Sequence, residues 1–242
     1  MQKYSADLKL AWNFLVKPQA QDSSSLKIFK SLPILGAGIG LIAYLIAEVI
    51  CFLGSGKGQA SVGSAFVAAI LLLALSVYIN KGRNIVALSW LGQLLEAIQN
   101  RSYEESPIAR HYSLFVVNIT YFCKLLAYTY LISQGHTEWF IFSFTLSLTA
   151  YSVNLPQAKL LNVEAGEIST NWITAAIISV ALIVILQNPV APAISFAAVY
   201  FLTQFTSRLI IKKLDVMNEH LCACFAEGAE LIALICALLI LG

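Results

Sequence analysis

The amino-acid sequence predicts an all-α protein, a polytopic membrane helix bundle with about seven transmembrane helices, or six if one segment spans only partly. Hydrophobic residues make up 59% of the 242 residues and charged residues only 12%. The mean hydropathy is +0.77, which is not the composition of a water-soluble domain. The apolar residues also gather in continuous runs close to the roughly 20 residues that a helix needs to cross a bilayer. The formal net charge of +2 is too small to indicate a nucleic-acid partner, so the lipid bilayer is the partner that the composition indicates.

Seven apolar segments come close to the length of a membrane span. In chain order they are Leu32–Leu53, Val62–Ile79, Ser113–Ser133, Trp139–Leu155, Trp172–Gln187, Val190–Ile210 and Leu221–Leu241. The second, fourth and fifth are short, so each could be tilted, re-entrant or extended by polar ends that pack against protein.

Two further segments have helical periodicity but are amphipathic. Asp7–Val16 places Leu8, Trp12 and Leu15 on one helix face, which predicts a helix lying along the bilayer surface. Asn84–Gln99 predicts either a cytoplasmic interfacial helix or a partial span.

The distribution of basic residues predicts the orientation of the bundle. Of the 15 lysines and arginines, thirteen fall on one side of the predicted spans and only Lys57 falls on the other, while Lys124 lies inside a span. The positive-inside rule therefore predicts a cytoplasmic N-terminus and an outer C-terminus, in a bacterial-type cytoplasmic (inner) membrane. No apolar run precedes Leu32, so no cleavable signal peptide is expected ahead of the first span.

The chain is predicted to form a single integral membrane domain over residues 1–242. Residues 1–30 form a cytoplasmic lead-in, and residues 80–112, 156–171 and 208–220 form cytoplasmic connections.

Four charged residues lie inside the apolar runs, where each costs on the order of 2.5–3.5 kcal/mol at a helix centre. They are Lys124, Glu48, Glu227 and Glu230. We expect Lys124 to pair with Glu227 in the bundle interior; snorkelling and protonation are the alternatives. A proton or ion pathway is the transporter interpretation of the same residues, although so few groups do not form a relay by themselves.

Small residues within the first span predict a close helix contact. Gly36, Gly38 and Gly40 resemble a nucleotide-binding fingerprint, but they follow no strand, so helix packing through Gly36 and Gly40 is the better interpretation. The five cysteines lie in or beside apolar runs and are interpreted as small buried hydrophobic residues.

The predicted cytoplasmic connections hold most of the polar residues. Their carboxylates are oxygen ligands that suit Mg²⁺, so the loops together could hold a magnesium ion and a phosphorylated ligand. The alternative is that these loops are polar simply because they are solvated.

Several segments of the chain match, in the same order, segments of a known family of membrane proteins. Leu8–Pro18 reads LKLAWNFLVKP, with Phe14 and Leu15 matching a Phe-Leu-Thr-Arg-Ile-Pro segment, and Ser31–Ile42 matches a Phe-Pro-hydrophobic-hydrophobic-Gly pattern. Glu105–Val117 keeps a Ser and an Ile of an Asp-Ser-Arg-Ile-Gly-Thr-Phe-Gly segment, and a lysine follows in the next span.

Near the C-terminus, Asn218–Leu234 reads NEHLCACFAEGAELIAL and is similar to a Gly-Asp-x-Leu-Gly-Ala segment with trailing glutamates. Over residues 8–241 the chain therefore resembles a divergent member of the cobalamin synthase family, the integral membrane adenosylcobinamide-GDP ribazoletransferases. Its acidic His-Leu-Asp-Gly-Leu-Ala-Asp run is missing: at Asn80–Ala97 the chain reads NKGRNIVALSWLGQLLEA, and Arg83 and Asn84 stand about where the first aspartate falls.

The resemblance implies transfer of α-ribazole, or its phosphate, onto adenosylcobinamide-GDP with release of GMP in cobalamin biosynthesis. It also implies a Mg²⁺ cofactor and a corrinoid nucleotide substrate. The alternative is a noncatalytic paralogue that binds a corrinoid or lipid or acts as a partner subunit, in a homo- or hetero-oligomer.

The resemblance and the polar connections together give the candidate site residues. The candidate catalytic residues are Glu105, Glu219, Lys124 and Glu227, of which Lys124 and Glu227 are expected to brace the spans beneath the site. The candidate substrate-binding residues are Arg110, His111, Ser106 and Asn218, and the candidate metal ligands are Glu105, Glu164, Glu167 and Glu219.

Overall fold

The computed structural model describes residues 9, 11–13, 25–55, 61–100, 107–158, 165–186, 190–214 and 219–241. Within these ranges every regular element is an α-helix and there is no β-strand, which confirms the expected all-α class. In the expected amphipathic lead-in Asp7–Val16, residues 9 and 11–13 are helical, and the remainder lies outside the described residues.

The described residues form eight long helices, seven of which follow the expected apolar segments. They are α2 (Ser25–Ser55), α3 (Val62–Ile79), α4 (Arg83–Asn100), α5 (Pro107–Ser133), α6 (Trp139–Ala158), α7 (Ala165–Leu186), α8 (Val190–Leu214) and α9 (Glu219–Leu241). Most helices extend past the apolar runs, because backbone hydrogen bonding does not require apolar side chains at helix ends that leave the bilayer. The expected connections 80–112, 156–171 and 208–220 are therefore partly helical, and α4 corresponds to the amphipathic segment Asn84–Gln99.

Five of the described helices contain a segment long and apolar enough to cross a membrane. These segments are Lys30–Gly54, Val62–Ile79, Tyr112–Ser133, Val190–Lys212 and Glu219–Leu241. Trp139–Leu155 and Thr170–Ala181 are shorter apolar helices and correspond to the fourth and fifth expected spans. By length and composition, the chain is an α-helical membrane bundle.

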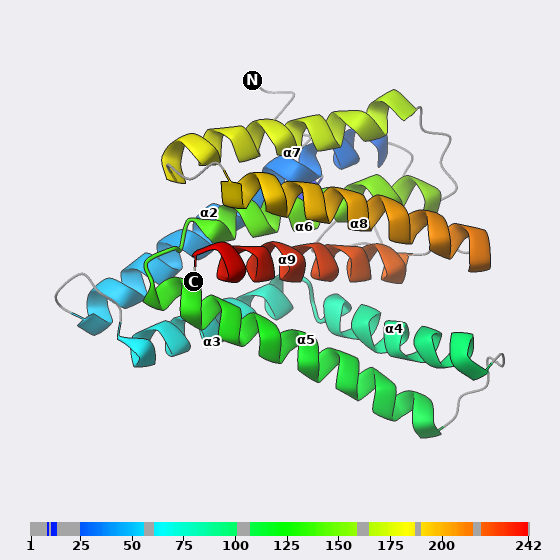
Figure 1. Cartoon of the computed structure of the whole chain (residues 1–242), viewed down its shortest axis with the longest axis horizontal. Helices are drawn as coiled ribbons and strands as arrows, with labels where there is room; N and C mark the ends of the chain where they lie inside the picture. The colour runs from blue at the N-terminus through cyan, green and yellow to red at the C-terminus, as the bar shows by residue number, and fades with distance from the viewer. Residues whose placement is uncertain are drawn as a thin grey trace.

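Helix α6 lies at the centre of this bundle. The helices run side by side along the long axis of the molecule, and α6 lies behind α8 in the view of Figure 1. It packs most extensively against α2 and α9, and also against α7 and α8. Most of its side chains between Trp139 and Leu155 are buried.

The central position of α6 explains why this helix contains fewer apolar residues than the five helices long and apolar enough to cross a membrane. It carries a series of hydroxyl side chains that are buried inside protein rather than exposed to lipid. Thr145 donates to the Ile141 carbonyl at 2.6 Å and Thr149 donates to the Thr145 carbonyl at 2.7 Å. Because these hydroxyls are satisfied within their own helix, α6 can be buried without unpaired polar groups at these positions.

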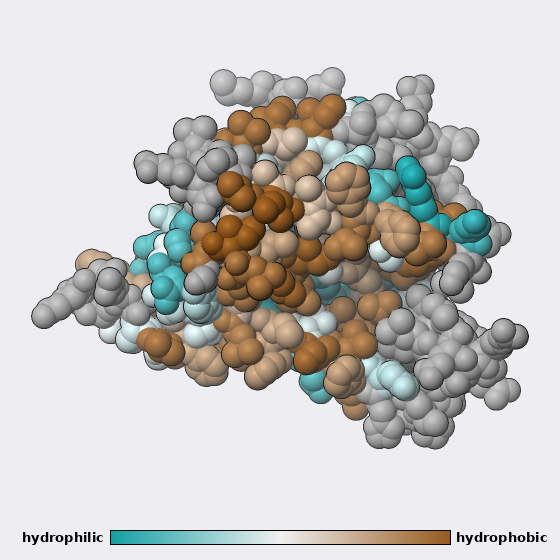
Figure 2. Space-filling model, in the orientation of Figure 1, coloured by the Kyte–Doolittle hydropathy of each residue, from teal (hydrophilic) through white to brown (hydrophobic). Residues whose placement is uncertain are grey.

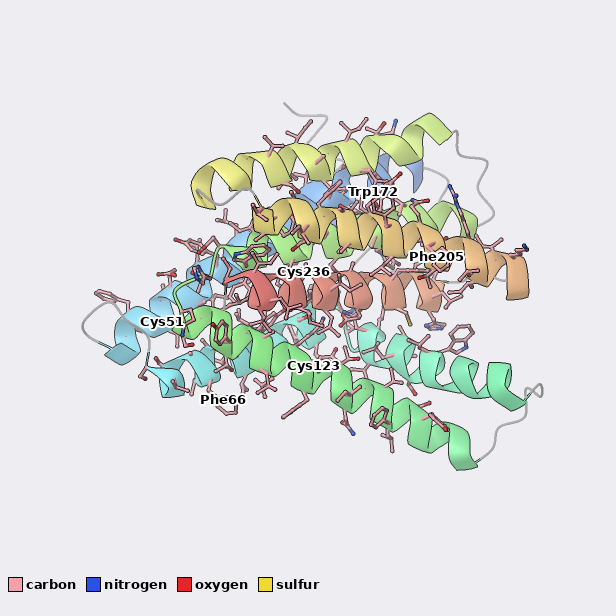
Figure 3. All side chains as sticks on the ribbon, viewed as in Figure 1. Cys51, Phe66, Cys123, Trp172, Phe205 and Cys236 are labelled. Carbon is pink, nitrogen blue, oxygen red and sulfur yellow. The ribbon has the colours of Figure 1, made fainter. Side chains whose placement is uncertain are left out.

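The outer helices carry the large exposed apolar side chains. Phe66 of α3 and Phe205 of α8 lie on the outside of the bundle (Figure 3), and Phe205 is 64% exposed. Apolar side chains cover much of the face formed by α8 and α9, while hydrophilic side chains gather toward the ends of the helices (Figure 2). This pattern is expected for a bundle whose outer surface contacts lipid.

Two glycines bring α2 against the backbone of α6. A Cβ atom added at Gly36 would lie 2.5 Å from the Phe144 carbonyl oxygen, and one at Gly40 would lie 2.5 Å from the Ile141 Cα. In contrast, a Cβ atom at Gly38 meets no described heavy atom within 4 Å. The expected packing role of Gly36 and Gly40 is confirmed.

A sharp turn separates α3 from α4 and places the start of α4 inside the bundle. Helix α3 ends at Ile79, and the Gly82 amide donates to the Val77 carbonyl at 2.9 Å. Lys81 and Gly82 have positive φ angles of 49° and 70°, a conformation that favours glycine. Helices α3 and α4 then follow one another along α5, and both pack against it (Figure 1).

Candidate functional site

A buried charged cluster joins α5 to α9. Lys124 lies 2.5 Å from Glu227 Oε2 and 2.8 Å from Glu230 Oε2. The three residues are 1%, 1% and 2% exposed respectively. The expected pairing of Lys124 with Glu227 is confirmed, and Glu230 joins it.

Donors from α4 and α5 satisfy all four carboxylate oxygens of this cluster. Besides the two bonds from Lys124, the Asn84 side-chain amide donates to Glu227 Oε1, and the Tyr128 hydroxyl donates to Glu230 Oε1. Buried carboxylates of this kind persist only when they are paired and hydrogen-bonded. The cluster therefore fixes the first turn of α4 against α5 and α9.

The sequence signal for the additional members of the cluster is helical spacing. Tyr128 lies four residues after Lys124 and Glu230 lies three residues after Glu227, so each pair shares a helix face. Asn84 gave no comparable signal, because its position depends on the turn between α3 and α4.

A cavity of about 300 Å³ lies next to this cluster. Its walls come from α2, α3, α4, α6 and α9. Two members of the charged cluster, Asn84 and Glu230, line it. Its other polar lining residues are Ser76, Asn80, Arg83, Ser147, Tyr151, Glu219 and His220. Glu219 and His220 open α9, whereas Glu230 lies about 16 Å further along that helix at 1.5 Å per residue. The cavity thus extends from the end of the bundle toward its middle.

The start of α4 brings a buried guanidinium nitrogen to the cavity wall. Arg83 Nη2 is buried, and within the described part of the chain it has no hydrogen-bond partner. Arg83 and Glu219 both lie near Tyr151 of α6 and act on it electrostatically. Near Glu219, the His220 ring stacks on Trp90 of α4, with ring centroids 6.4 Å apart. The sequence pattern predicts that Arg83 lies in a cytoplasmic connection and does not mark it as a binding residue.

The candidate site residues fall into three groups. Glu219 lines the cavity, and Lys124 and Glu227 form the ion pair beneath it. Arg110, His111 and Glu167 lie on helices α5 and α7, but their side chains are outside the described residues. Glu105, Ser106, Glu164 and Asn218 lie outside the described residues altogether.

The described residues do not form a site suited to Mg²⁺. Among them, no group of three His, Cys, Asp or Glu side chains is placed to hold a metal ion. The oxygens of Glu227 and Glu230 already accept hydrogen bonds from Lys124, Asn84 and Tyr128.

None of the five cysteines, all of them among the described residues, forms a disulfide. Cys51, Cys123 and Cys236 lie on three different helices, α2, α5 and α9 (Figure 3). Cys224 is partly buried and lies 3.0 Å from the Ala87 carbonyl of α4, which adds a contact between α4 and α9.

The fold and the cavity define the class of the chain as an α-helical membrane bundle with a polar cavity beside a buried charged cluster. Comparisons with protein families, curated proteins and solved structures found no match to the chain.

Proposed function

We propose that the chain is a cobalamin synthase-like membrane protein that transfers α-ribazole, or its phosphate, onto adenosylcobinamide-GDP with release of GMP. The observation that carries this proposal is the composition of the cavity wall. Asn80, Arg83 and Asn84 come from the segment that stands where the family has its acidic run, and Glu219 comes from Asn218–Leu234, which resembles a segment of the family. The two segments are far apart in the sequence and line the same cavity.

The proposed membrane arrangement has seven spans, with the N-terminus inside and the C-terminus outside a bacterial-type inner membrane. The excess of basic residues on one side supports this orientation. The short helices α6 and α7 are proposed as spans because α6 is surrounded by protein and α7 packs against α2, α6 and α8. In this arrangement Glu219 and His220 face the cytoplasm.

The chemistry proposed for the cavity is phosphoryl transfer. A hydroxyl oxygen of α-ribazole forms a bond to the phosphorus next to the cobinamide, the bond from that phosphorus to GMP breaks, and the hydroxyl proton is released. Glu219 is the candidate catalytic carboxylate that lines the cavity, and it would accept this proton. Because the described residues do not fit Mg²⁺, no step is assigned to a metal ion.

A second candidate function is binding without transfer, as in a noncatalytic paralogue. The arrangement that favours it is the full engagement of Glu227 and Glu230 by Lys124, Asn84 and Tyr128. These carboxylates serve to hold three helices together, so the cavity above them could bind a ligand without reacting with it.

We expect purified, detergent-solubilised protein to release GMP from adenosylcobinamide-GDP and α-ribazole, and Glu219→Gln to lower that rate about a hundredfold, because a positioned proton acceptor contributes a factor of this order. The matched control is Glu138→Gln, which removes a carboxylate just before α6. GMP release is followed with and without EDTA.

Binding of adenosylcobinamide-GDP with no GMP release would select the noncatalytic function. The absence of both binding and release, beside an active family member under the same conditions, would reject the family proposal.

A further inference from the structure

Arg83, which lines the cavity, carries a buried guanidinium nitrogen, Nη2, without a hydrogen-bond partner among the described residues. The Glu230 carboxylate, which lines the same cavity, is already bonded to Lys124 at 2.8 Å and to the Tyr128 hydroxyl. An unpaired buried donor on a charged group costs free energy, and a ligand that supplies an acceptor would recover that cost.

The surroundings of Arg83 favour an anion as that partner. Arg83 is the first residue of the 18-residue helix α4, whose aligned peptide dipoles place positive potential at this end. A guanidinium also presents a planar pair of donors that matches a phosphate group. The guanidinium and this end of α4 lie at the same wall of the cavity.

The remaining walls indicate what carries the anion. Ile39, Ile79, Phe144 and Leu148 line the cavity beside the polar residues. A ligand that fits this lining has a charged group at one point and an apolar body beside it.

We infer that Arg83 binds the phosphate group of an amphipathic ligand in this cavity, directly and without a metal ion. This inference rests on the proposed function for the identity of the site, but it assigns the charge-neutralising role to a side chain of this chain. The phosphate belongs either to a soluble phosphate ester or to a lipid headgroup, and both present the same oxygens to the guanidinium.

The test measures binding of inorganic pyrophosphate to the full chain in phosphatidylcholine nanodiscs by titration calorimetry. We expect wild-type protein to bind pyrophosphate, Arg83→Gln to weaken binding at least tenfold, and Arg83→Lys to weaken it less. Lys81→Gln is the matched control: it removes a positive charge two residues away, on an exposed side chain that does not line the cavity. We expect this variant to bind within twofold of wild type.

A second arm replaces part of the phosphatidylcholine by phosphatidic acid and measures the unfolding temperature. A rise in the unfolding temperature that Arg83→Gln removes, without pyrophosphate binding, would identify a lipid headgroup as the source of the phosphate. Pyrophosphate binding without such a rise would identify a soluble ester.

The inference is overturned if wild-type protein responds to neither probe, or if Arg83→Gln responds like wild type. Its failure can be told apart from failure of the proposed function. Arg83-dependent pyrophosphate binding without GMP release rejects the transferase and keeps the phosphate site. If Arg83→Gln leaves GMP release unchanged, the transferase proposal stands and the phosphate site at Arg83 is rejected.

Discussion

Replacement of Lys124 by methionine is expected to lower the free energy of unfolding by about 3–5 kcal/mol, the usual effect of removing one partner from a buried ion pair. Lys124 is the cation that contacts both Glu227 and Glu230. Without it, two carboxylates remain buried within hydrogen-bonding distance of neutral donors only. Thermal or denaturant unfolding in a fixed detergent measures the change.

Two further variants separate the loss of charge pairing from the loss of packing. Adding Glu227→Gln and Glu230→Gln to the Lys124 variant removes the unpaired charges, so we expect much of the lost stability to return. Lys212→Met, at an exposed position on α8, is expected to change the free energy of unfolding by less than about 0.5 kcal/mol. A similar small change in the Lys124 variant would show that the cluster does not stabilise the bundle.

The second large effect is expected at the contact between α2 and α6. Gly36→Ala and Gly40→Ala each place a methyl group 2.5 Å from α6 backbone atoms, so the two helices must separate. Overpacking costs typically about 1–3 kcal/mol, and the upper end applies here because backbone cannot rotate away as a side chain can. The yield of folded protein and its unfolding temperature measure this effect.

Gly38 provides the matched control within the same helix. The same substitution meets no described atom there and replaces glycine by a better helix former. We therefore expect Gly38→Ala to leave the unfolding temperature unchanged or slightly higher. Equal losses at Gly36, Gly38 and Gly40 would contradict the close contact.

Most of the helices were predictable because they follow continuous apolar runs; α4 instead follows an amphipathic pattern. The expected segment Val62–Ile79 has the same bounds as α3. Trp139–Leu155 gave a weaker signal, and the reason is physical: α6 is surrounded by other helices, so its hydroxyl side chains are not exposed to lipid and need not be replaced by apolar ones.

The ion pair was predictable for a related reason. A lysine and two glutamates inside apolar runs are costly unless they meet, so Lys124 and Glu227 could be paired without knowing the arrangement of the helices. The cavity could not be predicted in this way. It depends on which helices are neighbours, and on the turn at Lys81 and Gly82 that carries Arg83 into the bundle instead of leaving it in a solvated loop. The roles of Glu105, Glu164 and Asn218 remain predictions.

The charged cluster and the cavity are linked through the first turn of α4. Asn84 is held by Glu227, and Arg83 precedes it on the same turn. Interactions that stabilise the bundle therefore also position the guanidinium, which is how a structural ion pair supports a binding site.

The most direct test of the proposed binding site is equilibrium binding of adenosylcobinamide-GDP to the full chain. The visible absorbance of the corrinoid measures this binding. We expect saturable binding of adenosylcobinamide-GDP, which Arg83→Gln weakens at least tenfold and Lys81→Gln leaves unchanged. Absence of binding, or equal binding by all three proteins, would contradict the proposed site.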